Sequence, residues 1–253
     1  MRQHLGLLAV IAVTALGGTV AAGCASRIQT IIIDNEGGVA EAGSSGKTSS
    51  GTSGTSGTSG TSGTSGTSGG TCPDPTPIDQ TQLPWKPPAK SVGSCSAAEL
   101  QALVTYVNNN GSATYAQWKS AGVNNPTCRA CIFGLETATT WAPLLEDAAG
   151  QLVGLNVGGC VAIASSNVNC GKAYQNWFDC RFEACAACPS GDTAGLQKCL
   201  ADASKAGGAC NNAFNAVDTV CTATVITDAE AACTGTSFVF EGPVKAQCVG
   251  GVP

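Results

Sequence analysis

Cysteine limits the possible folds of this chain more than any other residue type. Fourteen of its fifteen cysteines lie in the last 182 residues, at a density of about 8%, which is typical of a disulfide scaffold. Disulfides persist in oxidising compartments, so we expect an exported protein. The cysteines available for seven bridges are Cys72, Cys95, Cys128, Cys131, Cys160, Cys170, Cys180, Cys185, Cys188, Cys199, Cys210, Cys221, Cys233 and Cys248.

The positions of the aromatic residues indicate one folded unit in the later part of the chain. All thirteen aromatic residues lie between Trp85 and Phe240, so a core has to form in that part, which is long enough to bury one.

The net charge is −5, with the acidic residues scattered. Binding of DNA or RNA needs clustered Lys and Arg, so nucleic acid is not expected as a partner.

Residues 1–23 have the form of an export signal. Arg2 precedes an apolar run over residues 5–16, and small residues lead to Gly23. The run is too short to span a bilayer as a mature helix. The segment Ala21-Ala22-Gly23-Cys24 resembles the lipobox of bacterial lipoproteins, although that family prefers Leu where this chain has Ala21.

This resemblance implies that Cys24 is lipidated and becomes the first residue of the processed chain. Lipidation of Cys24 would also leave an even number of cysteines for bridges. Ala25, rather than Asp, follows Cys24, which in Gram-negative sorting implies the outer membrane. Two alternatives stay open, namely ordinary cleavage after Ala22 with secretion, and an anchor that is not cleaved.

Residues 24–71 are predicted to form a flexible, disordered tether. Between Thr52 and Gly69 the triplet Thr-Ser-Gly occurs six times. Such a tract has nothing to bury and cannot offset its ordering entropy. A glycosylated stalk is the alternative.

Residues 72–94 are predicted to form an extended, proline-rich strap. Six prolines lie between Pro73 and Pro88, and this density favours a polyproline-like path. We expect the strap to lie along its own domain, with Trp85 packed against that domain and a disulfide from Cys72 fixing the start of the strap. A ligand segment for an aromatic groove is the alternative.

Residues 95–253 are predicted to form a mainly all-α, disulfide-rich domain. Ser96 and Glu99 form a capping-box pattern before an apolar stripe that ends near residue 107. Residues 152–163 and 237–240 are ambiguous and could be extended. Further helices are predicted over residues 112–121, 126–135, 170–188, 193–205 and 209–221.

The cysteine spacing supports helices that are linked to one another. Cys199, Cys210 and Cys221 are eleven residues apart, and eleven residues along a helix span about 16 Å. A disulfide needs Cα atoms within about 7 Å. Cys160, Cys170 and Cys180 are ten residues apart, and Cys170 and Cys180 share one predicted helix, so they must bond to neighbouring elements. This ten-residue spacing is similar to that of twin CX9C hairpins at Cys170 and Cys180 and leaves the pairing open.

The part from Cys95 to the C-terminus also resembles the uncharacterised cysteine-rich lipoproteins found in myxobacteria. The resemblance rests on the lipobox, the Thr-Ser-Gly tract and Asn169-Cys170-Gly171 followed by Cys180, Cys185 and Cys188. It implies no particular activity.

Few residues could support catalysis. The only histidine, His4, lies in the signal, which removes histidine-dependent nucleophilic and zinc sites from the processed chain. The motifs Cys128-Arg129-Ala130-Cys131 and Cys185-Ala186-Ala187-Cys188 could each be a redox couple or could hold zinc. Because so many other cysteines accompany them, we interpret both motifs as structural and expect no metal and no cofactor.

Two carboxylate pairs are the remaining enzymatic option, since glycoside hydrolysis needs only two such groups. Glu146 and Asp147 are expected to point apart on a helix. Asp179 and Glu183 are expected on a solvated face with Arg181 nearby. Neither arrangement favours catalysis, so the sequence predicts a protein that is not an enzyme.

The sequence therefore predicts a lipid-anchored cell-envelope protein that displays a non-catalytic binding or structural domain. It contacts the membrane through acylated Cys24, and a surface protein or glycan is its expected partner. One alternative is a CxxC thiol–disulfide oxidoreductase. The other is a helical disulfide cage around a small apolar ligand, lined by Trp118, Trp141, Trp177 and Phe178.

Overall fold

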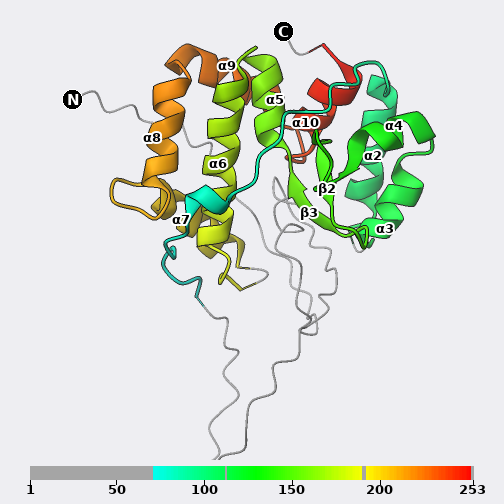
Figure 1. The fold of residues 1–253 in the computed structure, drawn as a ribbon. Coiled ribbons are helices and arrows are strands. Elements are labelled where there is room, and N and C mark those ends of the chain that lie inside the picture. The colour runs from blue at the N-terminus through cyan, green and yellow to red at the C-terminus, as the bar shows by residue number, and fades with distance from the viewer. Residues whose placement is uncertain (1–70, 112, 190–191, 252–253) are drawn as a thin grey trace, which may run out of the picture.

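The computed structural model describes residues 71–111, 113–189 and 192–251 and confirms a mainly helical, disulfide-rich domain (Figure 1). Cys24, the predicted signal and the tether up to residue 70 lie outside the described residues. The helices are α2 (Ala97–Asn109), α3 (Tyr115–Gln117), α4 (Pro126–Ile132), α5 (Val157–Ala164), α6 (Val168–Ala184), α7 (Thr193–Ser204), α8 (Asn211–Val220), α9 (Ala223–Cys233) and α10 (Glu241–Val244). Short helical turns are η1 (Gln80–Gln82), η2 (Trp118–Gly122) and η3 (Lys245–Val249).

Polar side chains begin many of these helices. The predicted capping box is present, because the Ser96 hydroxyl accepts from the Glu99 amide and the Glu99 carboxylate accepts from the Ser96 amide. Asn125 caps α4, whose first residue is Pro126. Asn167 caps α6 in the same way. Local sequence thus determines where these helices start.

A small sheet follows α4. It consists of β1 (Phe133–Leu135), β2 (Leu144–Glu146) and β3 (Leu152–Leu155), with β1 parallel and β3 antiparallel to the central β2. The predicted helix over residues 126–135 is therefore wrong at its end. The chain becomes extended at Phe133, which pairs with Leu144, and Leu135 is 47% exposed.

The two ambiguous segments take different structures. Residues 152–163 divide into β3 and α5, which are joined at Asn156, the cap of α5. Residues 237–240 form a turn before α10 and not a strand. Helix α9 also forms over residues that carried no helical prediction.

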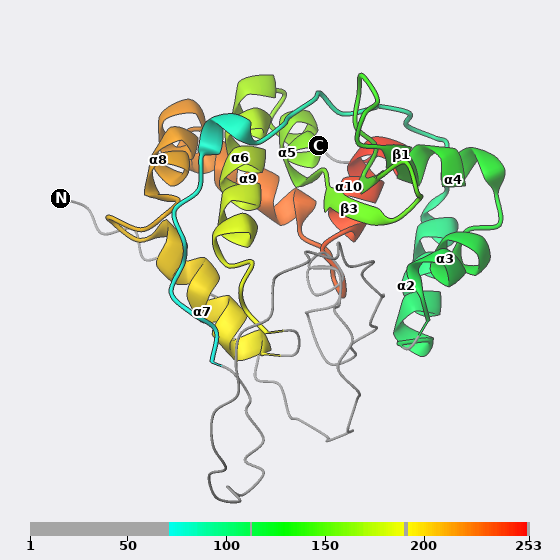
Figure 2. The ribbon, with the colours of Figure 1, turned by 60° about the horizontal axis from the view of Figure 1, so that its bottom comes forward.

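The elements form two neighbouring groups. In one group α6 packs mainly against α5 and α8, with α7 beside α6 and α9 beside α5. Helices α2, α3 and α4 and the sheet lie on the other side (Figures 1 and 2). Buried side chains form three clusters, and the partly buried Tyr174 and Trp177 on α6 each pack against two of them. Helix α6 is therefore the central element of the domain.

The proline-rich strap runs along both groups (Figure 1). The Thr76 amide donates to the Ala184 carbonyl oxygen (2.8 Å), and the Ala89 amide donates to the Trp141 carbonyl oxygen (2.7 Å). Trp85 is partly buried. Residues 72–94 thus follow the surface of their own domain.

Candidate functional site

The fourteen described cysteines form seven disulfides. Each bridge joins segments that are at least 14 residues apart, so the bridges fix tertiary rather than local structure. The pairs are Cys72–Cys188, Cys95–Cys128, Cys131–Cys248, Cys160–Cys233, Cys170–Cys221, Cys180–Cys210 and Cys185–Cys199.

Three of these bridges form a nested ladder. Along α6 and the turn that follows it, Cys170, Cys180 and Cys185 pair in reverse order with Cys221, Cys210 and Cys199. The paired segments therefore run antiparallel. As the helical spacing requires, Cys170 and Cys180 bond to other elements and not to each other.

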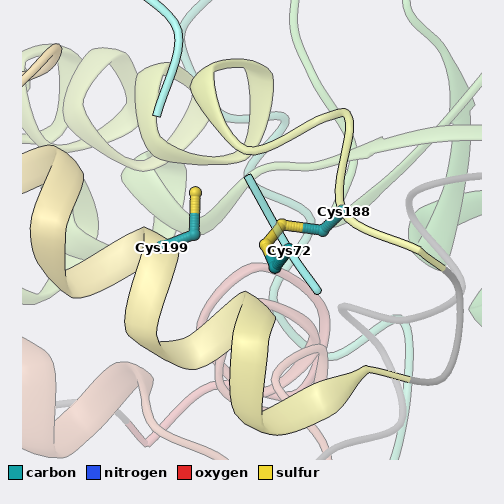
Figure 3. Close-up of side chains that lie close together, drawn as sticks. All are labelled: Cys72, Cys188 and Cys199. Atoms are coloured by element: carbon teal, nitrogen blue, oxygen red, sulfur yellow. A yellow bond between two sulfur atoms is a disulfide. The ribbon is translucent and has the colours of Figure 1, made fainter. Parts of the chain in front are cut away.

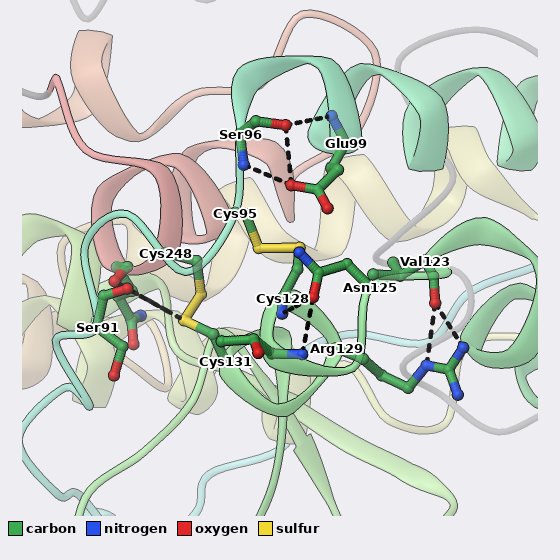
Figure 4. The surroundings of a disulfide bond; sticks show 12 residues. Ser91, Cys95, Ser96, Glu99, Val123, Asn125, Cys128, Arg129, Cys131 and Cys248 are labelled. Carbon is green, nitrogen blue, oxygen red and sulfur yellow. Dashed lines mark hydrogen bonds between the residues drawn. A yellow bond between two sulfur atoms is a disulfide. The ribbon is translucent and has the colours of Figure 1, made fainter.

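The first CxxC motif contains no internal disulfide (Figure 4). Cys128 bonds to Cys95, and Cys131 bonds to Cys248. The Arg129 guanidinium points to the backbone, because its Nε donates to the Val123 carbonyl oxygen at 3.0 Å. Arg129 thus closes the turn between η2 and α4 and does not face a thiol.

The second CxxC motif is divided in the same way, since Cys185 bonds to Cys199 and Cys188 bonds to Cys72. The sulfur atoms of Cys72, Cys188 and Cys199 lie within 4.8 Å of one another (Figure 3). All three belong to closed disulfides, whereas a metal ligand needs a free thiolate. While both bridges are closed, this trio offers no metal site.

The first carboxylate pair differs from the prediction. Glu146 lies on β2 rather than on a helix and is 5% exposed. It accepts a hydrogen bond from the Tyr115 hydroxyl (2.8 Å) and forms a salt bridge with Lys119 (2.7 Å). Asp147 closes the following turn by accepting from the Gln151 amide. Both carboxylates therefore have structural contacts.

The second pair is also placed differently. Glu183 is exposed, but Asp179 is partly buried, so the predicted solvated face is wrong for Asp179. Asp179 lines a cavity of about 170 Å³ between α6, the sheet and the strap. Burial raises the pKa of Asp179 to about 7, although Gln175 Nε2 donates a hydrogen bond to its carboxylate (2.9 Å).

The four aromatic residues that were proposed to line a single cage do not line one cavity. Trp118 is 2% exposed and packs against Tyr115 and Phe240. Trp141 and Phe178 border the Asp179 cavity, and Trp177 lies outside it. Within the described residues, these aromatic side chains instead pack in separate parts of the domain.

A second cavity of about 170 Å³ lies on the neighbouring face of α6, and we call it the Arg181 pocket. Its polar side chains come from α6 and α9, and its apolar walls come from α5, α6 and the turn before α10. The side chains that define it are Val157, Tyr174, Phe178, Arg181, Glu230, Phe238 and Val239.

Arg181 is held in this pocket by aromatic stacking. Its guanidinium carbon lies 3.7 Å from the centroid of the Trp177 ring, which places the cation over the indole face. The Trp177 Nε1 donates to Ser204 Oγ on α7 (2.9 Å), so the platform is itself fixed. Residues 174, 177, 178 and 181 have the spacing of one helical face.

The hydrogen-bonding capacity of Arg181 is unused within the described part of the chain. Its Nε is buried and has no acceptor, and its side chain forms no hydrogen bond or salt bridge with described residues. Burial lowers the pKa of Arg181, while Glu230 raises it. A buried donor without an acceptor costs about 1–3 kcal/mol.

Glu230 supplies the negative group of the pocket. The Tyr174 hydroxyl donates to its Oε1 at 3.2 Å. Burial raises the pKa of Glu230, and both the Tyr174 hydrogen bond and the Arg181 charge oppose that shift. The pocket therefore presents one cationic and one anionic side chain among apolar walls.

The turn that supplies Phe238 is organised by Glu241. This carboxylate accepts from the amides of Ser237 and Phe238 (2.7 Å each) and from the Thr236 amide (3.1 Å). Phe238 also stacks on the fully buried Phe240, with ring centroids 5.3 Å apart. This wall of the pocket is thus fixed by the backbone and by the core.

Sequence reasoning did not identify the Arg181 pocket. The predicted helix over residues 170–188 contains Tyr174, Trp177 and Phe178, and Arg181 enters the sequence analysis only as a neighbour of Asp179 and Glu183. The i, i+7 relation of Tyr174 and Arg181 was the available signal. Glu230 carried no signal, because α9 was not predicted.

Comparison with protein-family models, curated proteins and solved structures gives no match to this chain. Among the described residues, no helix combines the length and the hydropathy that a membrane span requires.

Proposed function

We propose that this chain is a lipid-anchored cell-envelope protein that displays a non-catalytic, disulfide-stabilised binding domain. The anchor is acylated Cys24, and Ala25 directs the protein to the outer membrane. The observation that carries the proposal is the cysteine pairing. Seven bridges use fourteen of the fifteen cysteines, so no cysteine is left to pair with Cys24.

Two observations support binding rather than catalysis. The processed chain has no histidine, because His4 lies within the predicted signal. Each CxxC motif divides its cysteines between two separate bridges, which leaves no dithiol to act as a redox couple. A cross-linked domain instead holds its surface loops in fixed positions, which favours recognition of a surface protein or a glycan.

The cavities beside α6 also bear on the choice of binding role. A cage for a purely apolar ligand would have apolar walls throughout, yet one cavity contains Asp179 and the other contains Arg181 and Glu230. Charged groups in small cavities favour a polar or ionic ligand. A carrier of lipid is therefore the weaker proposal.

Metabolic labelling tests the anchor. In a Gram-negative host fed an alkyne fatty acid, the wild-type chain should be labelled and should fractionate with the outer membrane. Cys24→Ser should lose the label, whereas the neighbouring change Ala25→Ser should keep it. Unlabelled wild-type protein in the culture medium would instead support simple secretion.

A further inference from the structure

We propose that the Arg181 pocket binds a small zwitterion with an apolar side chain, such as a free aliphatic or aromatic α-amino acid. Arg181 would hold its carboxylate, Glu230 its ammonium group, and the apolar walls its side chain. This inference rests on the binding role proposed above and names the ligand class.

The carboxylate partner is Arg181. The guanidinium carbon lies over the Trp177 ring, 3.7 Å from its centroid, and the Arg181 side chain lines the cavity. Its buried Nε finds no acceptor among the described residues. A guanidinium presents a planar fork of donors that matches a carboxylate, so this group is suited to that half of the ligand.

The ammonium partner is Glu230. It lines the same cavity, yet no salt bridge joins it to Arg181 among the described residues. The Tyr174 hydroxyl donates to Oε1 and orients the carboxylate, while Oε2 accepts no hydrogen bond from the described residues. A simple anion would meet repulsion from Glu230 and a simple amine would meet repulsion from Arg181, so a ligand with both charges is favoured.

The size and lining of the pocket select a small apolar side chain. A dry cavity of about 150 Å³ in another protein holds benzene, and the Arg181 pocket has about 170 Å³. Val157, Phe178 and Phe238 are largely buried and form its apolar wall. A ligand of about nine non-hydrogen atoms, such as leucine, fits this space with an expected dissociation constant of about 1–100 μM.

Three matched probes separate the charge requirements by calorimetric titration of the detergent-extracted full chain. Leucine carries both charges, 4-methylpentanoate lacks the ammonium group, and 3-methylbutylamine lacks the carboxylate. Leucine should bind, and each singly charged analogue should bind at least about tenfold more weakly. Phenylalanine, tested alongside, covers the aromatic side chains of the proposed class.

Variants then assign the groups. Arg181→Met keeps an unbranched stem against Trp177 and should weaken leucine binding by at least about thirtyfold. Glu230→Gln should weaken it about tenfold while leaving 4-methylpentanoate unaffected or improved. Lys172→Met makes the same kind of change at an exposed position of α6 and should leave binding unchanged. Near-ultraviolet circular dichroism checks that each variant is folded.

Two results would overturn the proposal. Folded wild-type protein that binds neither leucine nor phenylalanine at about 1 mM has no such site. Equal binding of leucine and 4-methylpentanoate, with no effect of Glu230→Gln, would make it a plain anion site. Fatty-acid labelling at Cys24 does not depend on either result, so failure of the pocket and failure of the anchor are distinguishable.

Discussion

Gly158 on α5 and Gly171 on α6 meet at direct backbone contact. A Cβ atom added to Gly171 would lie 2.4 Å from the Gly158 carbonyl oxygen, and one added to Gly158 would lie 2.3 Å from the Gly171 carbonyl oxygen. Only glycine at both positions lets the two helices approach this closely. The contact also places Val157, the first residue of α5, at the wall of the Arg181 pocket.

Gly171→Ala should therefore destabilise the fold. In an open helical position this change would stabilise by about 1 kcal/mol through helix propensity, but the clash with backbone atoms should reverse the sign. We expect a loss of about 1–3 kcal/mol in urea unfolding. Lys172→Ala, on the exposed face next to it, should stay within about 0.5 kcal/mol. A stabilised Gly171→Ala variant would show that α5 and α6 are not in contact here.

Asp179 should make stability depend on pH. Its ordinary pKa of 3.8 is raised to about 7 in the fold, mainly by burial. Below about pH 3.8 the group is protonated in both states. Between that value and about pH 7 only the unfolded chain loses the proton, so the free energy of unfolding falls as pH rises. Glu136 and Glu183 are the other acidic residues that border this cavity.

Asp179→Asn removes this titration and keeps an acceptor for Gln175. The variant should match the wild type near pH 4 and be more stable by about 2–4 kcal/mol at pH 8. Urea midpoints of both chains across pH 4–8 measure the difference. A constant difference over that range would mean that Asp179 is solvated.

Lys119 should stabilise the fold through Glu146. The Glu146 side chain is 7% exposed and the Lys119 side chain is 34% exposed, so removing the cation leaves a largely buried carboxylate without its ion pair. Lys119→Met should cost about 2–3 kcal/mol, which is less than the about 3–5 kcal/mol typical of a fully buried pair because Lys119 is partly solvated. Adding Glu146→Gln should recover part of that loss, and additive losses in the double variant would argue against the pairing.

The disulfide pairing can be read from tryptic peptides prepared without reduction. Cleavage after Lys90, Lys119 and Arg129 separates residues 91–119 from residues 120–129. The Cys95–Cys128 bridge predicts that these two peptides stay linked to each other alone. An internal Cys128–Cys131 bridge would instead join residues 120–129 to the peptide that begins at Ala130.

Local signals made part of the fold predictable. The Ser96 and Glu99 capping box and the Asn125-Pro126 start depend on neighbouring residues only, and both helices begin there. Helical spacing likewise excluded a bridge between Cys170 and Cys180. The partner of each cysteine depends on how the helices pack, which no spacing determines.

Other features depend on tertiary contacts. Residues 144–146 have no strand pattern of their own, and they become β2 because Leu144 pairs with both Phe133 and Leu155. The burial of Glu146 follows from that pairing. The Arg181 pocket needs Glu230 from α9, which packs beside α5. The pocket could therefore not be predicted from the sequence of α6 alone.

The intact mass of the membrane-extracted protein, with thiols alkylated before any reduction, tests the central claim most directly. The account predicts a chain that starts at Cys24, carries acyl chains and has no alkyl label, because all other cysteines are in bridges. A lipid-free chain that starts at Gly23 with one alkylated cysteine would contradict the anchor. Alkylated cysteines within either CxxC motif would contradict the pairing and reopen redox chemistry.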